Sequence, residues 1–213
     1  MDNNKKIIKI LKTEYPNPTC ELEYSTPFQL LVAVVLSAQC TDKRVNMVTK
    51  VLFEKYPTAL DMDLANIEDI QDIIKPCGFY HNKAKAIKSL SHDIVHKFDN
   101  KFPKNKTQLK TLAGVGEKTA NVVVSLVYNT PAIAVDTHVF RVSNRLGLAN
   151  ANTPEKTQKQ LEQVLNKKDW SKSHYALVLH GRYVCKAIKP KCSECCFNKY
   201  CTHFKQNGVI FKK

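Results

Sequence analysis

The chain has 213 residues, enough to bury a substantial core in one domain or in two small ones. Its 33 lysines and arginines against 19 aspartates and glutamates give a net charge of +14, which favours a nucleic-acid partner over a membrane surface. The longest apolar run, residues 30–36, is far shorter than the roughly 18 residues of a membrane span, and lysines interrupt the apolar N-terminal residues. We therefore expect a soluble, intracellular protein without a signal peptide. In a reducing compartment its eight cysteines favour metal binding over disulfides.

Hydrophobic periodicity and capping residues predict helices along the whole chain. An amphipathic helix over residues 5–12 comes first, and the next, over residues 28–36, is apolar on nearly every side. Thr26 would cap this second helix, with Pro27 in its first turn and Gln29 completing a capping box, so we expect it to be the buried centre of a helical domain. Further helices are predicted from residue 42, over 66–75, over 83–98, from 107, over 117–128, over 137–146, from 154 and over 173–180. Since strand alternation and internal repeats are both absent from the sequence, the predicted fold class is all-α.

Two glycines one residue apart, Gly114 and Gly116, predict a tight hairpin between two helices. Unpaired N–H groups at the start of the second helix form an anion site, and for a basic protein the expected anion is a nucleic-acid phosphate. Lys118 lies in the first turn of that helix, where the helix dipole favours the free amine, which can attack a sugar carbon and form a Schiff base. An ordinary turn and a solvated phosphate contact are the simpler interpretations of the glycines and of the lysine.

Asp136 is the carboxylate that could assist such a reaction. It precedes a helix that Thr137 opens, so backbone N–H groups should hold the carboxylate in its ionised form. An ionised carboxylate can stabilise a developing cation or move a proton. Taken alone, an aspartate at this position is most often a helix cap.

The C-terminal segment carries a compact set of cysteines with intervals of six, two and five residues, namely Cys185, Cys192, Cys195 and Cys201. Four thiolates so close in sequence can converge on one centre, and their uneven spacing suits a [4Fe–4S] cluster better than the paired Cys-x2-Cys hairpins of structural zinc, which is the next alternative. Cys196 adjoins Cys195, and the spacing favours Cys195 as the ligand. Interleaved lysines such as Lys191 would grip a DNA backbone or simply be solvated.

Together these motifs resemble the endonuclease III family of DNA glycosylases over nearly the whole chain. The matching segments are Ser37-Ala38-Gln39, Leu112 to Asn121, Val135 to Arg141 and the cysteine spacing. The resemblance implies a base-excision repair N-glycosylase that removes oxidised or otherwise damaged pyrimidines from double-stranded DNA and cleaves the strand by β-elimination as an AP lyase. Lys118 would be the nucleophile, Asp136 the essential carboxylate, and the four cysteines would hold a structural [4Fe–4S] cluster.

The resemblance also implies DNA contacts and a domain arrangement. Gln39 would fill the gap left by an extruded base, and Phe79, where the family usually has leucine, would be an apolar wedge beside it. Gly114 and Gly116 of the helix-hairpin-helix and Lys191 would contact the DNA backbone. A six-helix domain over residues 20–130 and an iron–sulfur domain from residues 1–19 and 131–213 would form two helical lobes of a nucleoid-associated monomer. From the residues alone, Gln39 could be a surface loop residue and Phe79 a packing residue.

Other functions stay open. A sister branch of the superfamily removes adenine from mismatches, but it generally lacks the lysine at position 118 and carries a large additional C-terminal domain. A thymine-mismatch glycosylase of similar length is harder to dismiss. A non-catalytic helix-hairpin-helix module would bind DNA without any need for Lys118, and an iron–sulfur electron carrier would leave the hairpin and the basic charge unexplained.

Overall fold

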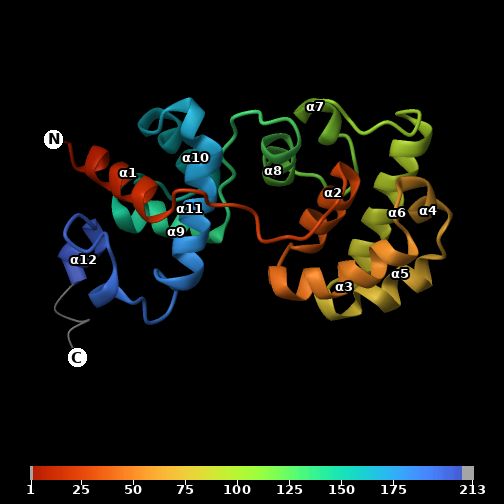
Figure 1. Ribbon diagram of the computed structural model, residues 1–213, viewed down its shortest axis with the longest axis horizontal. Helices are drawn as coiled ribbons and strands as arrows, with labels where there is room; N and C mark the ends of the chain where they lie inside the picture. Colours follow the sequence, from red (N-terminus) through yellow and green to blue (C-terminus); the bar gives the residue numbers. More distant parts are fainter. Residues whose placement is uncertain (1, 208–213) are drawn as a thin grey trace. The chain divides into compact units, whose positions relative to one another are not determined.

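The computed structural model describes residues 2–207, and within that range every regular element is helical, which confirms the all-α prediction (Figure 1). The α-helices are α1 (Asn3–Glu14), α2 (Pro27–Leu36), α3 (Asp42–Lys55), α4 (Ala59–Leu64), α5 (Ile67–Ile74), α6 (Tyr80–His96), α7 (Lys106–Leu109), α8 (Glu117–Val127), α9 (Thr137–Leu146), α10 (Pro154–Val164), α11 (Trp170–Tyr183) and α12 (Thr202–Asn207). Short 3-10 helices are η1 (Lys75–Cys77), η2 (Lys167–Asp169) and η3 (Cys192–Glu194). None of the helices between residues 2 and 207 is long and apolar enough to cross a bilayer.

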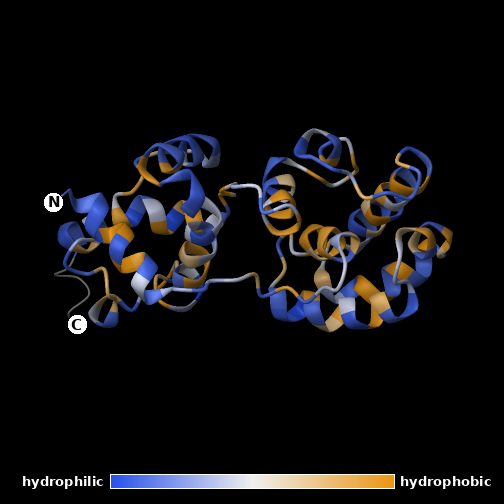
Figure 2. Ribbon diagram, turned by 45° about the horizontal axis from the view of Figure 1, so that its top comes forward, coloured by the Kyte–Doolittle hydropathy of each residue, from blue (hydrophilic) through white to orange (hydrophobic). Residues whose placement is uncertain are grey.

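The chain divides into two compact units. One comprises Glu21–Thr130, which contains α2 to α8, and the other combines Met1–Cys20 with Pro131–Lys213. Both units contain many buried apolar side chains, and their helices carry hydrophobic as well as hydrophilic residues (Figure 2). Each unit therefore has a hydrophobic core of its own.

Helix α2 is the centre of the Glu21–Thr130 unit, as predicted. All nine residues from Phe28 to Leu36 are buried, because α3, α6 and α8 pack around the helix. Thr26 caps it by accepting a hydrogen bond from the Gln29 N–H. The predicted capping box is wrong in one respect: the Gln29 side chain accepts from the Ser25 N–H at 2.9 Å rather than from the cap residue.

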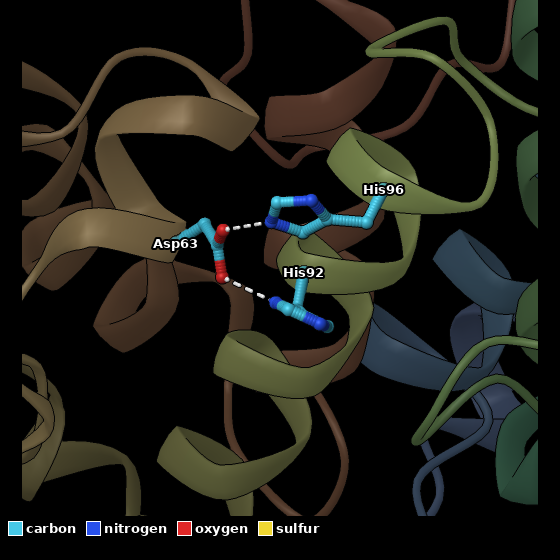
Figure 3. A group of neighbouring side chains, drawn as sticks. All are labelled: Asp63, His92 and His96. Atoms are coloured by element: carbon cyan, nitrogen blue, oxygen red, sulfur yellow. Dashed lines mark hydrogen bonds and ion pairs between the residues drawn. The ribbon is translucent and has the colours of Figure 1, made fainter.

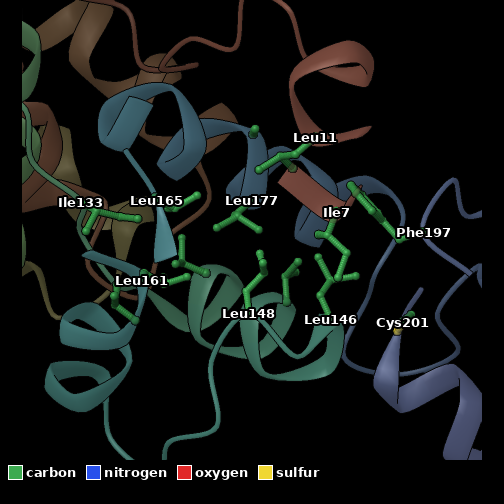
Figure 4. Close-up of a cluster of buried hydrophobic side chains, with 14 residues drawn as sticks. Ile7, Leu11, Ile133, Leu146, Leu148, Leu161, Leu165, Leu177, Phe197 and Cys201 are labelled. Carbon is green, nitrogen blue, oxygen red and sulfur yellow. The ribbon is translucent and has the colours of Figure 1, made fainter. Parts of the chain in front are cut away.

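The second unit is closed by the N-terminal helix. Ile7 and Leu11 of α1 enter a buried cluster together with residues of α9, α10 and α11 (Figure 4). Phe197 and Cys201 join the same cluster from the C-terminal segment, and the Asn3 side chain donates to the Tyr200 carbonyl at 3.0 Å. The cysteine segment is thereby packed directly on a hydrophobic core.

Two predicted helix starts in the Glu21–Thr130 unit are wrong by two or three residues. Helix α6 begins at Tyr80 instead of residue 83, because Phe79 adopts a left-handed conformation and its carbonyl accepts from the Lys83 N–H. Helix α7 is capped by Asn105 and not by Thr107, since the Asn105 side chain accepts from the Gln108 N–H at 2.9 Å.

The C-terminal part differs from the prediction in a similar way. Helix α11 begins at Trp170, where the indole N–H donates to the Leu165 carbonyl, so Ser173 lies buried inside the helix instead of capping it. The short helices α4 and α12, six residues each, were not predicted because such lengths carry little periodic signal. Within residues 2–207, α11 is consequently followed by one further α-helix, α12.

Candidate functional site

The two glycines of the hairpin between α7 and α8 differ in backbone conformation and in surroundings. Gly114 has a left-handed φ of +75°, and a Cβ there would lie 3.1 Å from the Ala86 Cβ of α6 and 3.5 Å from Val35 of α2. Gly116 has a φ of −85°, which any residue adopts, and nothing lies within 4 Å of its Cβ position. Gly114 is therefore required by the fold, whereas the space in front of Gly116 is open to a ligand.

This difference predicts opposite effects of two alanine substitutions. Gly114→Ala should destabilise the protein by about 1–2 kcal/mol, because alanine is strained at positive φ. Gly116→Ala should leave the free energy of unfolding within about 0.5 kcal/mol of the wild-type value, because the poorer helix cap is offset by a less flexible unfolded chain. If DNA approaches that open space, Gly116→Ala should weaken duplex binding by about tenfold, or roughly 1.4 kcal/mol. Thermal unfolding and fluorescence anisotropy measure the two effects, and equal loss of stability in both variants would contradict the distinction.

The first turn of α8 presents an exposed lysine, Lys118. Gly116 provides no side-chain cap for α8, so the first N–H groups of the helix have no such acceptor. Glu117 forms ion pairs with Lys106 and Lys110, and hydrogen bonds from these two ammonium groups lower the pKa of its carboxyl group. Lys118 is exposed, and no hydrogen bond or ion pair within residues 2–207 engages its side chain. Its amine is consequently available to a bound molecule.

Asp136 caps α9, as predicted. Its Oδ1 accepts from the N–H groups of His138 and Val139 at 2.9 and 2.8 Å, and its Oδ2 lies 3.2 Å from the His138 Nδ1. The carboxylate is 16% exposed, so its orientation is fixed while one edge stays accessible. A carboxylate held in this way by backbone donors is suited to face a positive charge.

Gln39 and Phe79 both project from strained backbone. Their φ values are 54° and 49°, in the left-handed region that side chains other than those of Gly, Asn and Asp seldom adopt, and both residues are exposed. Such strain persists only where the surrounding structure imposes it, and it is often found at functional sites.

Lys83 holds the two loops that carry these residues, and sequence analysis missed it. Its buried ammonium donates to the Leu36 carbonyl at 2.9 Å, shortly before Gln39, and to the Cys77 carbonyl at 3.0 Å, shortly before Phe79. Burial lowers the pKa of Lys83. Its place in the apolar stripe formed by residues 83, 87, 90 and 94 was a signal in the sequence, because a lysine on a buried helix face needs acceptors.

We expect Lys83→Met to destabilise the protein by about 2 kcal/mol, or roughly 4–8 °C in melting temperature, because two buried carbonyls lose their donor. Lys85→Met is the matched control, since Lys85 lies on the exposed face of the same helix. Differential scanning calorimetry measures both variants. A melting temperature of Lys83→Met equal to that of Lys85→Met would show that the ammonium does not hold the loops.

The four predicted cysteines surround one cavity. Cys185, Cys192, Cys195 and Cys201 all line it, together with Arg145 and His180, whereas Cys196 does not line it. Burial raises the pKa of the Cys192 and Cys201 thiols, and a hydrogen bond with Cys196 together with burial raises the pKa of Cys195 to about 12. Four thiols around one small apolar cavity form a donor set that fits a polynuclear metal centre.

Two further residues that sequence analysis missed support the cysteine loop. His180 lies between the Tyr15 hydroxyl, 2.9 Å from its Nδ1, and the Cys195 Sγ, 3.5 Å from its Nε2. The Arg145 guanidinium reaches the Cys185 Sγ at 3.5 Å and the carbonyl of Lys186 at 2.7 Å. A cation beside thiolates would offset part of their negative charge. Neither residue carries a motif of its own, so only the fold reveals these roles.

Comparison with known proteins shows the family of the chain. A family profile described as HhH-GPD superfamily base excision DNA repair protein matches residues 32–167. Endonuclease III of Bacillus subtilis is 49% identical over 182 residues, covering 85% of this chain and 83% of the relative. The chain belongs to the endonuclease III family.

The likeness to this family extends over the whole fold. Endonuclease III of Escherichia coli strain K12 is 38% identical over 198 residues, covering 93% of this chain and 94% of the relative. A solved structure titled as a non-covalent endonuclease III–DNA complex superposes with a TM-score of 0.92 at 42% identity, covering 98% of this chain and all of that one. Membership of the endonuclease III family therefore applies to both units of the chain.

Proposed function

We propose that the chain is a base-excision repair DNA glycosylase with AP lyase activity, which removes oxidised pyrimidines from double-stranded DNA. The observation that carries this proposal is Lys118 in the first turn of α8, a lysine that is exposed and has no hydrogen-bond or ion-pair partner among the described residues 2–207, in a member of a base-excision repair family. The net charge of +14 favours the approach of a polyanionic duplex. Such an enzyme would act on chromosomal DNA inside the cell, at the nucleoid.

In the proposed reaction the Lys118 amine attacks the C1′ carbon of the damaged nucleotide. A carbon–nitrogen bond forms, and the base leaves with the electron pair of the glycosidic bond and takes up a proton. C1′ is then bonded to both the lysine nitrogen and the ring oxygen O4′; the nitrogen loses a proton, the C1′–O4′ bond breaks, and O4′ takes up a proton, which leaves a Schiff base on the opened sugar. The Schiff base acidifies the C2′ hydrogen, whose loss breaks the bond from C3′ to its phosphate oxygen and cuts the strand. Asp136 stabilises the positive charge on the sugar and takes part in the proton transfers, which its fixed orientation supports.

Gln39 and Phe79 are proposed to enter the duplex beside the extruded nucleotide. Their exposure, their left-handed backbone and the shared anchor at Lys83 support this role, since an inserted side chain must resist displacement by the base stack. The hairpin residues Gly114 and Gly116 are proposed to receive a DNA phosphate at the N-terminus of α8, with Gly116 at the open position.

The unit formed by Met1–Cys20 and Pro131–Lys213 is proposed to carry an iron–sulfur centre and to add contacts to the DNA backbone. Lys191 is exposed while its N–H donates to the Val184 carbonyl at 3.0 Å, so the backbone that presents the side chain is fixed. A [4Fe–4S] cluster held by Cys185, Cys192, Cys195 and Cys201 would stabilise this segment and take no part in base removal. The unit over Glu21–Thr130 is accordingly proposed as the domain of the helix-hairpin-helix.

Adjacent cysteines allow a matched test of the ligand set. We expect Cys195→Ser to lose most of the bound iron and its visible absorbance, because Cys195 lines the cavity. Cys196→Ser should retain both, because Cys196 does not line it. Iron content per chain, measured by atomic absorption, decides the assignment. Iron loss in Cys196→Ser with retention in Cys195→Ser would reverse it.

The proposed function is tested on a duplex that carries one oxidised thymine. Base release and strand cleavage are followed separately, and both should occur at comparable rates, since one lysine intermediate leads to both. Duplexes carrying an adenine or a thymine mismatch serve as competitors. Faster release of a mismatched base would favour a mismatch glycosylase, and tight binding without release from any duplex would favour a non-catalytic binding module.

A further inference from the structure

A cluster of three side chains in the Glu21–Thr130 unit takes no part in the proposed reaction. Asp63 of α4 faces His92 and His96 of α6, which stand one turn apart on the same helix face (Figure 3). The Asp63 Oδ1 lies 3.2 Å from the His92 Nδ1, and its Oδ2 lies 3.1 Å from the His96 Nε2. From these contacts we propose that the trio is a binding site for a divalent transition-metal ion of the zinc class.

The geometry fits tetrahedral coordination. At metal–ligand distances of about 2.0–2.1 Å, two ligands of a tetrahedral zinc lie about 3.3 Å apart. Each imidazole nitrogen lies at a similar distance from one carboxylate oxygen of Asp63, His92 from Oδ1 and His96 from Oδ2. One ligand atom of each residue lies within 4.8 Å of the others. The His92 and His96 rings are 60% and 55% exposed, so they can rotate to close the remaining gap. Two imidazoles and one carboxylate form a donor set that binds zinc, nickel or copper in preference to magnesium or calcium.

The position of Asp63 is set independently of any metal. The Lys88 ammonium donates to the main-chain carbonyls of Asp63 and Ala65 and so fixes the end of α4 against α6. The Asp63 side chain is only 11% exposed, which limits its rotation. A carboxylate that is already held in place loses little conformational entropy when the ion binds.

The bound ion would act as a clip between α4 and α6. Because the two imidazoles leave one face of the cluster in solvent, a water molecule could complete the coordination, and the ion could exchange. Helix α6 also carries Lys83, which anchors the loops of Gln39 and Phe79. Metal binding would therefore stabilise the element on which these loops depend.

Equilibrium dialysis of the full-length, iron-loaded protein against zinc chloride tests the site. The wild-type chain should bind one zinc ion more than the double variant His92→Gln/His96→Gln. His81→Gln is the matched control, because His81 is an exposed histidine of the same helix that contacts Gln71 and lies outside the cluster. Zinc bound by cysteines is common to all three proteins and subtracts out.

Single substitutions test whether His96 and Asp63 each contribute to zinc binding. His96→Gln and Asp63→Asn should each weaken zinc binding by tenfold or more, since loss of even an outer-shell partner of a metal ligand costs about 10–100-fold. Zinc should raise the melting temperature of the wild type and of His81→Gln by more than that of the double variant. Equal zinc content and equal thermal shifts in the wild type and the double variant would overturn the proposal, whether or not the protein cleaves DNA.

Discussion

Lys118→Ala is expected to lower strand cleavage of an oxidised duplex by a factor on the order of 10³ or more, because the variant has no amine to form the Schiff base. Duplex binding should weaken only slightly and equally for all sequences, as for the loss of one phosphate contact. Since Lys118 is exposed and engaged by no side chain within residues 2–207, the fold should be unaffected. Single-turnover cleavage, fluorescence anisotropy and thermal unfolding give the three readouts.

Lys110→Ala is the matched control for this substitution. It removes a lysine from the same hairpin, and Glu117 keeps Lys106 as an ion-pair partner. This variant should cleave at nearly the wild-type rate once the duplex is saturating. Cleavage by Lys118→Ala at the rate of Lys110→Ala would exclude Lys118 as the nucleophile.

Asp136→Asn should lower cleavage by about 10²–10⁴-fold, the range expected for loss of a general acid–base group, with little change in stability. Asparagine caps helices as well as aspartate does, so the backbone N–H groups of His138 and Val139 keep an acceptor. The substitution therefore removes the charge and leaves the structural role. The observed rate constant in single-turnover cleavage is the measurement.

Asp136→Ala separates the two roles of this residue. It should lose activity to the same extent and in addition lose about 1 kcal/mol of stability through the missing cap. If Asp136→Asn cleaved like the wild type while only the alanine variant were impaired, Asp136 would be a helix cap alone.

Much of the fold could be predicted because the local signals were strong. Thr26 and Pro27 mark the start of α2, its continuous apolar run predicts complete burial, and Gly147 ends α9 with a φ of +85°. The predicted start of α6 is wrong because the helix begins directly after the left-handed Phe79. The polar residues near Phe79 are typical of a loop. Ser173 resembled a cap although it is buried, since serine suits both environments.

The candidate site was predictable where its residues are close in sequence. The hairpin glycines, the adjacent Lys118 and the four cysteines are all local patterns, and their roles in DNA repair stay predictions of the family resemblance. Lys83 could have been noticed on its apolar helix face, but its two carbonyl partners come from separate loops. The approach of Asp63 to His92 and His96 depends on the packing of α4 against α6, which no local pattern encodes.

Borohydride trapping tests most directly whether Lys118 forms a covalent intermediate with DNA. The purified protein is incubated with borohydride and a duplex carrying one oxidised thymine, and the trapped complex is digested for mass spectrometry. We expect a covalent protein–DNA adduct whose modified peptide carries the sugar on Lys118 and which is absent from the Lys118→Ala variant. Base release without any adduct would contradict a lysine intermediate, because the glycosidic bond would then be broken by activated water.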